Sequence, residues 1–163
     1  GFPYQQIVEK FKGTNRDISF SDDSINNLLY TKYGSGDILL VMSILYPWAD
    51  LKNHFHIDHM FPKSLFTRKR IQKLGVPDTQ TDFYIDNVNY IGNLQLLEEL
   101  PNKEKNNTEF KTWLEQNYAD ADKLKAYREK HYIPDVGVEF TNFEEFFLER
   151  EKLLFKALKA ALI

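Results

Sequence analysis

Apolar residues in the first 47 positions recur at the spacing of helices. Residues 3–12 predict a short helix, which has a proline at its start and Gly13 just after it. A second helix is expected from Ser21 or Asp22 to Tyr33, because either of these first residues can cap a helix N-terminus. A third, strongly apolar helix follows over residues 37–46, where a proline ends it. The chain therefore begins with helices.

The pattern changes at residues 54–58, His-Phe-His-Ile-Asp, where polar and apolar residues alternate. A period of two is typical of a half-buried strand, and residues two apart then share one face. His54, His56 and Asp58 are expected on one face of this strand. Residues 94–97 are a second short strand candidate. The sequence thus predicts two short strands among helices.

Between and after the two strands, the pattern again predicts mainly helices. Ser64 is placed to cap a basic helix over residues 65–74, while residues 76–90 read as a loop with one helical turn. A helix is expected from Pro101 to about residue 118, and another over residues 120–132.

The C-terminal segment has the pattern of a long amphipathic helix. Thr141 and Glu144 form a capping box at its start. A helical stripe of apolar residues follows, made of Phe143, Phe147, Leu154 and Leu158, and packing alone explains it. The whole pattern predicts an α+β fold that is mostly helical. No linker is evident, so residues 1–163 are assigned to a single domain.

Composition excludes several classes of protein. The chain is 42% hydrophobic and 15% aromatic, so it can bury a core, unlike a disordered chain. It has no apolar run of the ~18 residues that a membrane span needs, and no signal peptide is visible. It has no cysteine, which excludes disulfides and thiolate zinc sites and favours a cytoplasmic location. The net charge of −3 argues against a large DNA footprint.

Two segments concentrate the groups that phosphodiester hydrolysis needs, which are a base for water and a cation for phosphoryl charge. Asp58 offers the hard oxygen that Mg²⁺ or Mn²⁺ prefers. His59 follows it, and an imidazole with an ordinary pKa of ~6.5 suits a general base near neutral pH. Asn102 adds a neutral carbonyl oxygen from the first turn of the predicted helix. The segments therefore predict a site for one divalent cation.

These segments also resemble a known family. Residues 56–64, His-Ile-Asp-His-Met-Phe-Pro-Lys-Ser, resemble the first motif of HNH (His-Me finger) nucleases. Residues 91–97 with residues 101–105, Pro-Asn-Lys-Glu-Lys, resemble the second half of that motif. The ordered set is similar to the C-terminal domain of GmrSD-type modification-dependent (type IV) restriction endonucleases. The resemblance implies a ββα-metal core over about residues 52–118, with flanking helices over 1–47 and 119–163.

The resemblance also implies roles for individual residues. Asp58 and Asn102 would bind the metal, and His59 would activate the attacking water. Asn93 would brace the loop that holds His59, and Lys105 would lie near the phosphate. Plainer interpretations stay open, because Asn93 is also a common turn residue, Asn102 a helix-start residue and Lys105 a solvated helix charge.

Three further features lie outside these assigned roles. His56 could hydrogen bond to a metal ligand, act as a third ligand or contact substrate. His54 reads as an exposed strand residue. The dense basic run over residues 68–73 is either a solvated helix face or a patch that follows the phosphates of DNA.

The predicted function is therefore metal-dependent DNA cleavage with Mg²⁺, Mn²⁺ or another divalent cation, and the resemblance implies products with a 5′-phosphate and a 3′-hydroxyl. The resemblance places this activity in a restriction system that defends against phage. It implies DNA as substrate and, as partner, an N-terminal nucleotide-hydrolysing, modification-sensing part, whose P-loop is absent from this sequence. The alternative is a module on the same core that binds nucleic acid or a partner without cutting.

Overall fold

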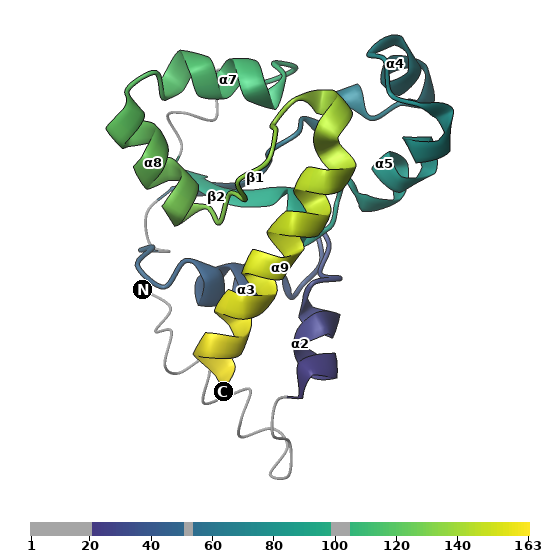
Figure 1. The fold of residues 1–163 in the computed structure, drawn as a ribbon. Coiled ribbons are helices and arrows are strands. Elements are labelled where there is room, and N and C mark those ends of the chain that lie inside the picture. The colour runs from purple at the N-terminus through teal and green to yellow at the C-terminus, as the bar shows by residue number, and fades with distance from the viewer. Residues whose placement is uncertain (1–20, 51–53, 99–104) are drawn as a thin grey trace.

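The computed structural model describes residues 21–50, 54–98 and 105–163 (Figure 1). The described helices are α2 (Asp22–Leu28), α3 (Ile38–Leu45), α4 (Arg68–Lys73), α5 (Thr81–Asn87), α7 (Phe110–Asn117), α8 (Ala121–Lys130) and α9 (Phe143–Leu162). Short 3-10 turns cover Lys63–Leu65, Asp78–Gln80, Ile91–Asn93 and Phe140–Asn142. The helix predicted over residues 3–12 lies outside the described residues, as does Asn102.

Two antiparallel strands form the sheet, β1 (Phe55–His59) and β2 (Leu94–Glu98). Both strand predictions are confirmed. β1 begins and ends one residue later than the predicted 54–58, and β2 extends one residue beyond the predicted 94–97. In the register Asp58 pairs with Gln95 and His59 with Leu94. Together with the helices around it, this small sheet makes the fold α+β, as the sequence predicts.

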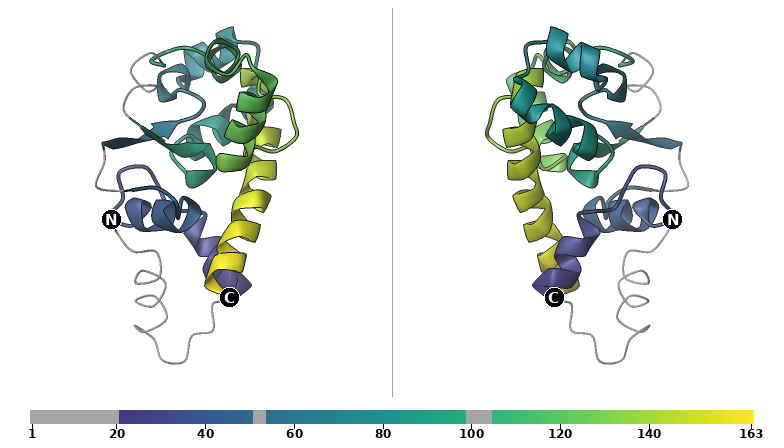
Figure 2. Two further views of the ribbon diagram at one scale, coloured as in Figure 1. Left: turned by 90° about the vertical axis from the view of Figure 1, so that its left-hand side faces the viewer. Right: turned by 90° about the vertical axis from the view of Figure 1, so that its right-hand side faces the viewer.

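The sheet has a buried cluster on each face. Successive side chains of a strand point to opposite faces, so each strand can contribute apolar residues to both clusters. Leu97 belongs to an aromatic cluster beneath α7 and α8, and Leu94 and Leu96 belong to an aliphatic cluster with α3. Figure 1 shows α7 and α8 on one side of the strand pair and α3 on the other, and the views in Figure 2 agree. Helix α9 contributes to both clusters, so it joins the two sides of the sheet.

Helix α9 also carries a buried arginine that holds together the backbone before β2 and the backbone after α8. Arg150 is 1% exposed and donates hydrogen bonds to the carbonyl oxygens of Ile91 (2.9 Å) and His131 (3.1 Å). These carbonyls lie just before β2 and just after α8. The arginine therefore ties β2 to α8 by satisfying backbone groups that would otherwise be buried without partners.

The stripe predicted on the last helix is confirmed, since its four apolar residues are all buried in α9. The predicted capping box is wrong. Thr141 lies in the 3-10 turn that runs directly into α9, and Asn142 takes the N-cap position without a side-chain hydrogen bond. Asp120 does cap α8, where its carboxylate accepts from the amides of Asp122 and Lys123.

Several other helix predictions needed correction. The cap predicted at Ser64 is wrong, because Ser64 lies inside a 3-10 turn and the Thr67 side chain accepts from the amide of Arg70 instead. Helix α2 ends at Leu28, before the predicted Tyr33. Helix α5 lies where the sequence indicated mainly loop. The helix predicted from Pro101 to about residue 118 is wrong over residues 105–109, where a turn precedes α7, and α7 confirms it over Phe110–Asn117.

Gly92 shows why the segment before β2 needs glycine. A Cβ at this position would lie 2.5 Å from Cε2 of the Phe147 ring. Phe147 is 2% exposed and packed among other aromatic rings, so it cannot easily move. The close approach of α9 to this turn therefore requires the absence of a side chain. None of the described helices is long and apolar enough to cross a bilayer.

Candidate active site at the end of the first strand

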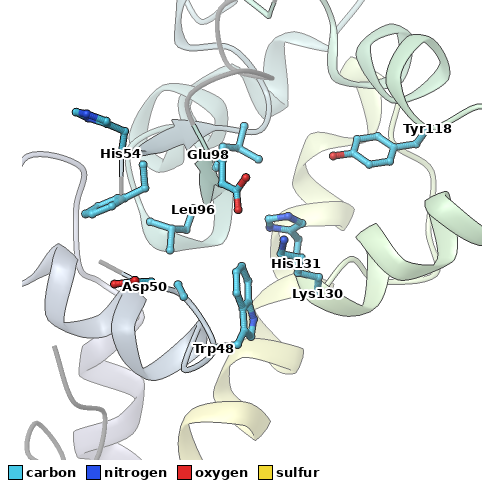
Figure 3. Close-up of a pocket in the computed structure, with 11 residues that line it drawn as sticks. Trp48, Asp50, His54, Leu96, Glu98, Tyr118, Lys130 and His131 are labelled. Carbon is cyan, nitrogen blue, oxygen red and sulfur yellow. The ribbon is translucent and has the colours of Figure 1, made fainter. Parts of the chain in front are cut away.

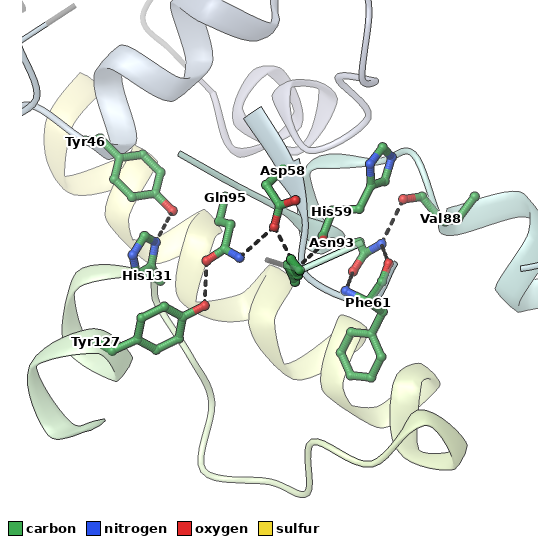
Figure 4. Close-up of polar contacts among 10 residues, drawn as sticks. Tyr46, Asp58, His59, Phe61, Val88, Asn93, Gln95, Tyr127 and His131 are labelled. Atoms are coloured by element: carbon green, nitrogen blue, oxygen red, sulfur yellow. Dashed lines mark hydrogen bonds and ion pairs between the residues drawn. The ribbon is translucent and has the colours of Figure 1, made fainter. Parts of the chain in front are cut away.

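Asp58 lies near the end of β1 with 14% of its side chain exposed. Its Oδ2 atom accepts a hydrogen bond from Lys105 Nζ at 2.6 Å and another from Gln95 Nε2 at 3.0 Å (Figure 4). The Tyr127 hydroxyl donates in turn to Gln95 Oε1 at 2.5 Å. Both contacts to the carboxylate end on Oδ2, so Oδ1 has no hydrogen bond to the described part of the chain. A hydrogen-bonded network of Lys105, Gln95 and Tyr127 thus fixes the carboxylate.

Lys105 is almost fully buried, with 2% of its side chain exposed. Besides Asp58, its ammonium donates to the carbonyl oxygen of His59 and lies 5.2 Å from the centre of the Trp113 ring. Burial lowers the pKa of Lys105 to about 8, although the Asp58 carboxylate opposes this shift. The interpretation of Lys105 as a solvated helix charge is therefore wrong. Lys105 lies in a turn and its ammonium reaches Asp58 on β1, whose negative charge it compensates.

His59 is half-buried at the last position of β1. Its imidazole packs against the Tyr33 ring with centroids 4.7 Å apart, and its Nε2 atom lies 2.9 Å from Asn89 Oδ1. Burial lowers the pKa of His59 below 6.5, against the opposing effects of Asn89 and Asp58. The ring is therefore mainly neutral at pH 7, which is the form that can accept a proton.

Asn93 holds the backbone that follows His59. Its Oδ1 accepts from the amide of Phe61 (2.9 Å), and its Nδ2 donates to the carbonyls of Phe61 (3.1 Å) and Val88 (3.0 Å). The carbonyl of Asn93 itself accepts from the amide of Met60 at 2.8 Å. Asn93 is fully buried, and these three side-chain hydrogen bonds to backbone groups satisfy its amide. It joins the end of β1 to the segment after α5.

The remaining predicted site residues are less defined. His56 lies on the same face of β1 as Asp58, is exposed and makes no side-chain hydrogen bond to the described residues. Asn102 lies outside them. Within the described ranges no group of three or more histidine, cysteine or acidic residues could hold a metal ion. The proposed ligand pair therefore stays a prediction, of which Asp58 is the described member.

The basic run on α4 is exposed and partly paired. Arg68 forms an ion pair with Asp82 at 2.8 Å, and Arg70 donates to the carbonyl of Ser64 at 2.5 Å. These contacts connect α4 to its neighbours on the surface. They agree with a solvated helix face and leave contact with phosphates untested.

Sequence reasoning missed Asn89 and Tyr33. Both lie in segments that it treated as helix end or loop, and neither belongs to a motif. They reach His59 because the backbone of residues 31–33 pairs with residues 89–91, as in the hydrogen bond from the Tyr33 amide to the Asn89 carbonyl (2.8 Å). No local signal in the sequence announces this pairing.

A separate pocket of about 210 Å³ lies at the opposite end of the sheet (Figure 3). Trp48, Glu98 and His131 are among the residues that line it. His131 is 2% exposed, and the Tyr46 hydroxyl, which is 2.9 Å from its Nδ1, can donate to the neutral ring. Burial lowers the pKa of His131 to about 3, with further lowering by Arg150.

This buried histidine should make stability depend on pH. Between pH 6.5 and 3 the unfolded chain protonates His131 while the folded chain keeps it neutral. The free energy of unfolding should therefore fall as pH drops below 6.5, by roughly 1 kcal/mol per pH unit from this group. Urea unfolding at several pH values checks this. His131→Gln should flatten the slope by that amount, and an unchanged slope would contradict the assignment.

A model of the family described as "GmrSD restriction endonucleases, C-terminal domain" matches residues 10–152. The match covers most of the chain, including both strands and all the predicted site residues. No curated protein matches this sequence.

Proposed function

Because the chain belongs to the C-terminal domain family of the GmrSD restriction endonucleases, we propose that it is an HNH-type DNA endonuclease that requires one divalent cation. Family membership points to the nuclease module of a restriction system. The observation that carries the finer proposal is at the end of β1, where a fixed carboxylate and a neutral imidazole are consecutive residues. Asn93 ties the backbone directly after them.

His59 is the proposed general base. A mainly neutral imidazole at pH 7 can take a proton from the water that attacks the phosphorus. The backbone on its C-terminal side is fixed by Asn93, and its ring is fixed by Tyr33 and Asn89. This arrangement limits the motion of the base, which favours a productive geometry.

Asp58 and Asn102 are the proposed ligands of the cation, which when bound would stabilise charge on the phosphoryl and leaving oxygens. The donor chemistry of Asp58 fits a hard cation, since Oδ1 has no hydrogen bond to the described residues. Lys105 already compensates much of the carboxylate charge, however. We therefore expect the free protein to bind the cation weakly, with phosphate oxygens of DNA completing the site.

Cleavage of plasmid DNA tests the proposal. Supercoiled plasmid incubated with the chain and Mn²⁺ or Mg²⁺ should be nicked or linearised, and EDTA should prevent this. The products should carry 5′-phosphates and 3′-hydroxyls, so DNA ligase should reseal a nick without any other treatment of the ends. DNA that is retained in a gel-shift assay but never cut would instead support the binding-module alternative.

Asp58→Asn should weaken Mn²⁺ binding at least tenfold in calorimetry, because the amide loses the negative charge that attracts the cation. Asparagine is preferable to alanine here, since it still accepts a hydrogen bond from the buried Lys105. Thermal unfolding shows whether the variant remains folded after Lys105 loses its charged partner. Asp86→Asn, on the exposed surface of α5, is the matched control. Equal Mn²⁺ affinity in the wild type and Asp58→Asn would remove Asp58 from the metal site.

We further propose that this module works with an N-terminal nucleotide-hydrolysing, modification-sensing part, in the same polypeptide or in a partner. The net charge of −3 supports this division of labour, because it gives the chain little general attraction for DNA. We therefore expect the chain alone to bind DNA weakly and with a shallow dependence on salt concentration, because few phosphates would be neutralised.

A further inference from the structure

The side-chain amide of Asn89 contacts the proposed base from outside both sequence motifs. Its Oδ1 atom lies 2.9 Å from His59 Nε2, a distance typical of an N–H···O hydrogen bond. An amide oxygen can only accept, so the neutral ring must carry its proton on Nε2 to make this bond. Nδ1 then keeps its lone pair, and it makes no hydrogen bond to the described residues.

The position of Asn89 is itself fixed by its neighbours. The preceding carbonyl, that of Val88, accepts from Asn93 Nδ2 (3.0 Å), and the carbonyl of Asn89 accepts from the Tyr33 amide (2.8 Å). Asn93 also binds the backbone of Phe61, two residues after His59. One buried side chain therefore connects the segment carrying Asn89 to the segment carrying His59 and fixes their separation.

Tyr33 also contacts the His59 imidazole, but this contact is a packing of two rings and not a hydrogen bond. Its ring lies against the imidazole at an interplanar angle of 50°, with 47% of Tyr33 exposed. Such a contact limits ring tilt without preferring a proton on either nitrogen. The hydrogen bond to Asn89 is the contact that distinguishes the two nitrogens.

We infer that Asn89 is a positioning residue for His59, which holds the ring in the Nε2–H tautomer so that Nδ1 is the atom that takes the proton from water. This inference rests on the proposed function of His59 as the base. The hydrogen bond itself is a property of the folded chain, so it can be tested without any cleavage.

Two substitutions separate the hydrogen bond from the side-chain volume. Asn89→Leu keeps the size and removes the acceptor, whereas Asn89→Asp keeps an acceptor at the same position. Asn87→Leu is the matched control, because Asn87 is half-buried on α5 and its Nδ2 donates to the Phe83 carbonyl (2.8 Å), away from His59. Thermal unfolding identifies any variant that fails to fold.

The first measurement is ¹⁵N-edited NMR of the imidazoles at about pH 8, well above the ordinary histidine pKa of ~6.5. The chain has four histidines, so a His59→Ala spectrum assigns the His59 signal. An Nε2–H proton protected from exchange should be seen in the wild type, Asn89→Asp and Asn87→Leu, and lost in Asn89→Leu. Its persistence in Asn89→Leu would overturn the inference.

The second measurement is cleavage kinetics in the presence of Mn²⁺. Asn89→Leu should lower kcat roughly 10- to 100-fold with little change in KM, while Asn89→Asp should restore most of the turnover. An unchanged kcat in Asn89→Leu would overturn the positioning role. If the wild type does not cleave DNA at all, the proposed function fails, and the NMR comparison still decides whether Asn89 holds His59.

Discussion

Replacing His59 with alanine is expected to lower plasmid cleavage by roughly 10²- to 10⁴-fold, the range that a general base contributes. The physical reason is the loss of an imidazole at the end of β1 that is mainly neutral at pH 7 and able to accept a proton from water. The carboxylate of Asp58 and its contacts to Lys105 and Gln95 are left in place. Metal-supplemented nicking assays under single-turnover conditions measure the effect.

The control for this substitution is His54→Ala, which removes an exposed imidazole just before β1 and should cleave like the wild type. His59→Ala should remain folded by circular dichroism, because the ring is only half-buried and is absent from both buried clusters. Added imidazole should restore part of the activity if the lost group is the base. Near-normal turnover in His59→Ala would reject His59 as the base.

The largest expected effect on stability comes from Lys105→Met. Methionine matches the length of the lysine side chain but removes the ammonium that faces Asp58 at 2.6 Å. Removing one partner of a buried ion pair leaves the other charge uncompensated, at a cost of about 3–5 kcal/mol. The carbonyl of His59 also loses its hydrogen-bond donor. Urea unfolding at pH 7, where Lys105 is still mainly protonated, gives the change in free energy.

A double-mutant cycle isolates the ion pair from these other losses. Adding Asp58→Asn to Lys105→Met removes the orphaned charge, so the double variant should be more stable than Lys105→Met alone. Lys111→Met on α7 is the matched control, since Lys111 is exposed and its pairing with Glu139 at 3.7 Å is on the surface. A loss below about 1 kcal/mol in Lys105→Met would mean that the pair contributes little to the fold.

The strand pair is the part of the site that local pattern predicts well. Residues 54–58 alternate polar and apolar side chains because β1 has a buried cluster on one face and the polar chain from Lys105 to Tyr127 on the other. A strand whose two faces meet different surroundings leaves this signal in the sequence. The stripe on α9 is predictable for the same reason, since its buried side repeats with the period of a helix.

Helix boundaries were harder to predict where two residues could serve as the cap. Ser64 and Thr67 both have the hydroxyl that a helix N-cap needs, but Ser64 lies inside a 3-10 turn, so Thr67 is the N-cap of the regular helix. Similarly, Asp120 caps α8 while Thr141 does not cap α9. The residue type identifies possible N-cap residues, and the conformation of the backbone decides which of them caps the helix.

By itself, the sequence determined the α+β class, the two strands, the apolar face of the last helix and the consecutive Asp58 and His59, because each depends on neighbours close along the chain. Only the tertiary structure decided that Lys105 is buried against a carboxylate 47 positions away and that Asn89 reaches His59 from 30 positions away. The sequence around a charged or amide residue looks the same whether its side chain is exposed to water or paired with another residue. Its partner is chosen by the packing of distant segments, which no local pattern records.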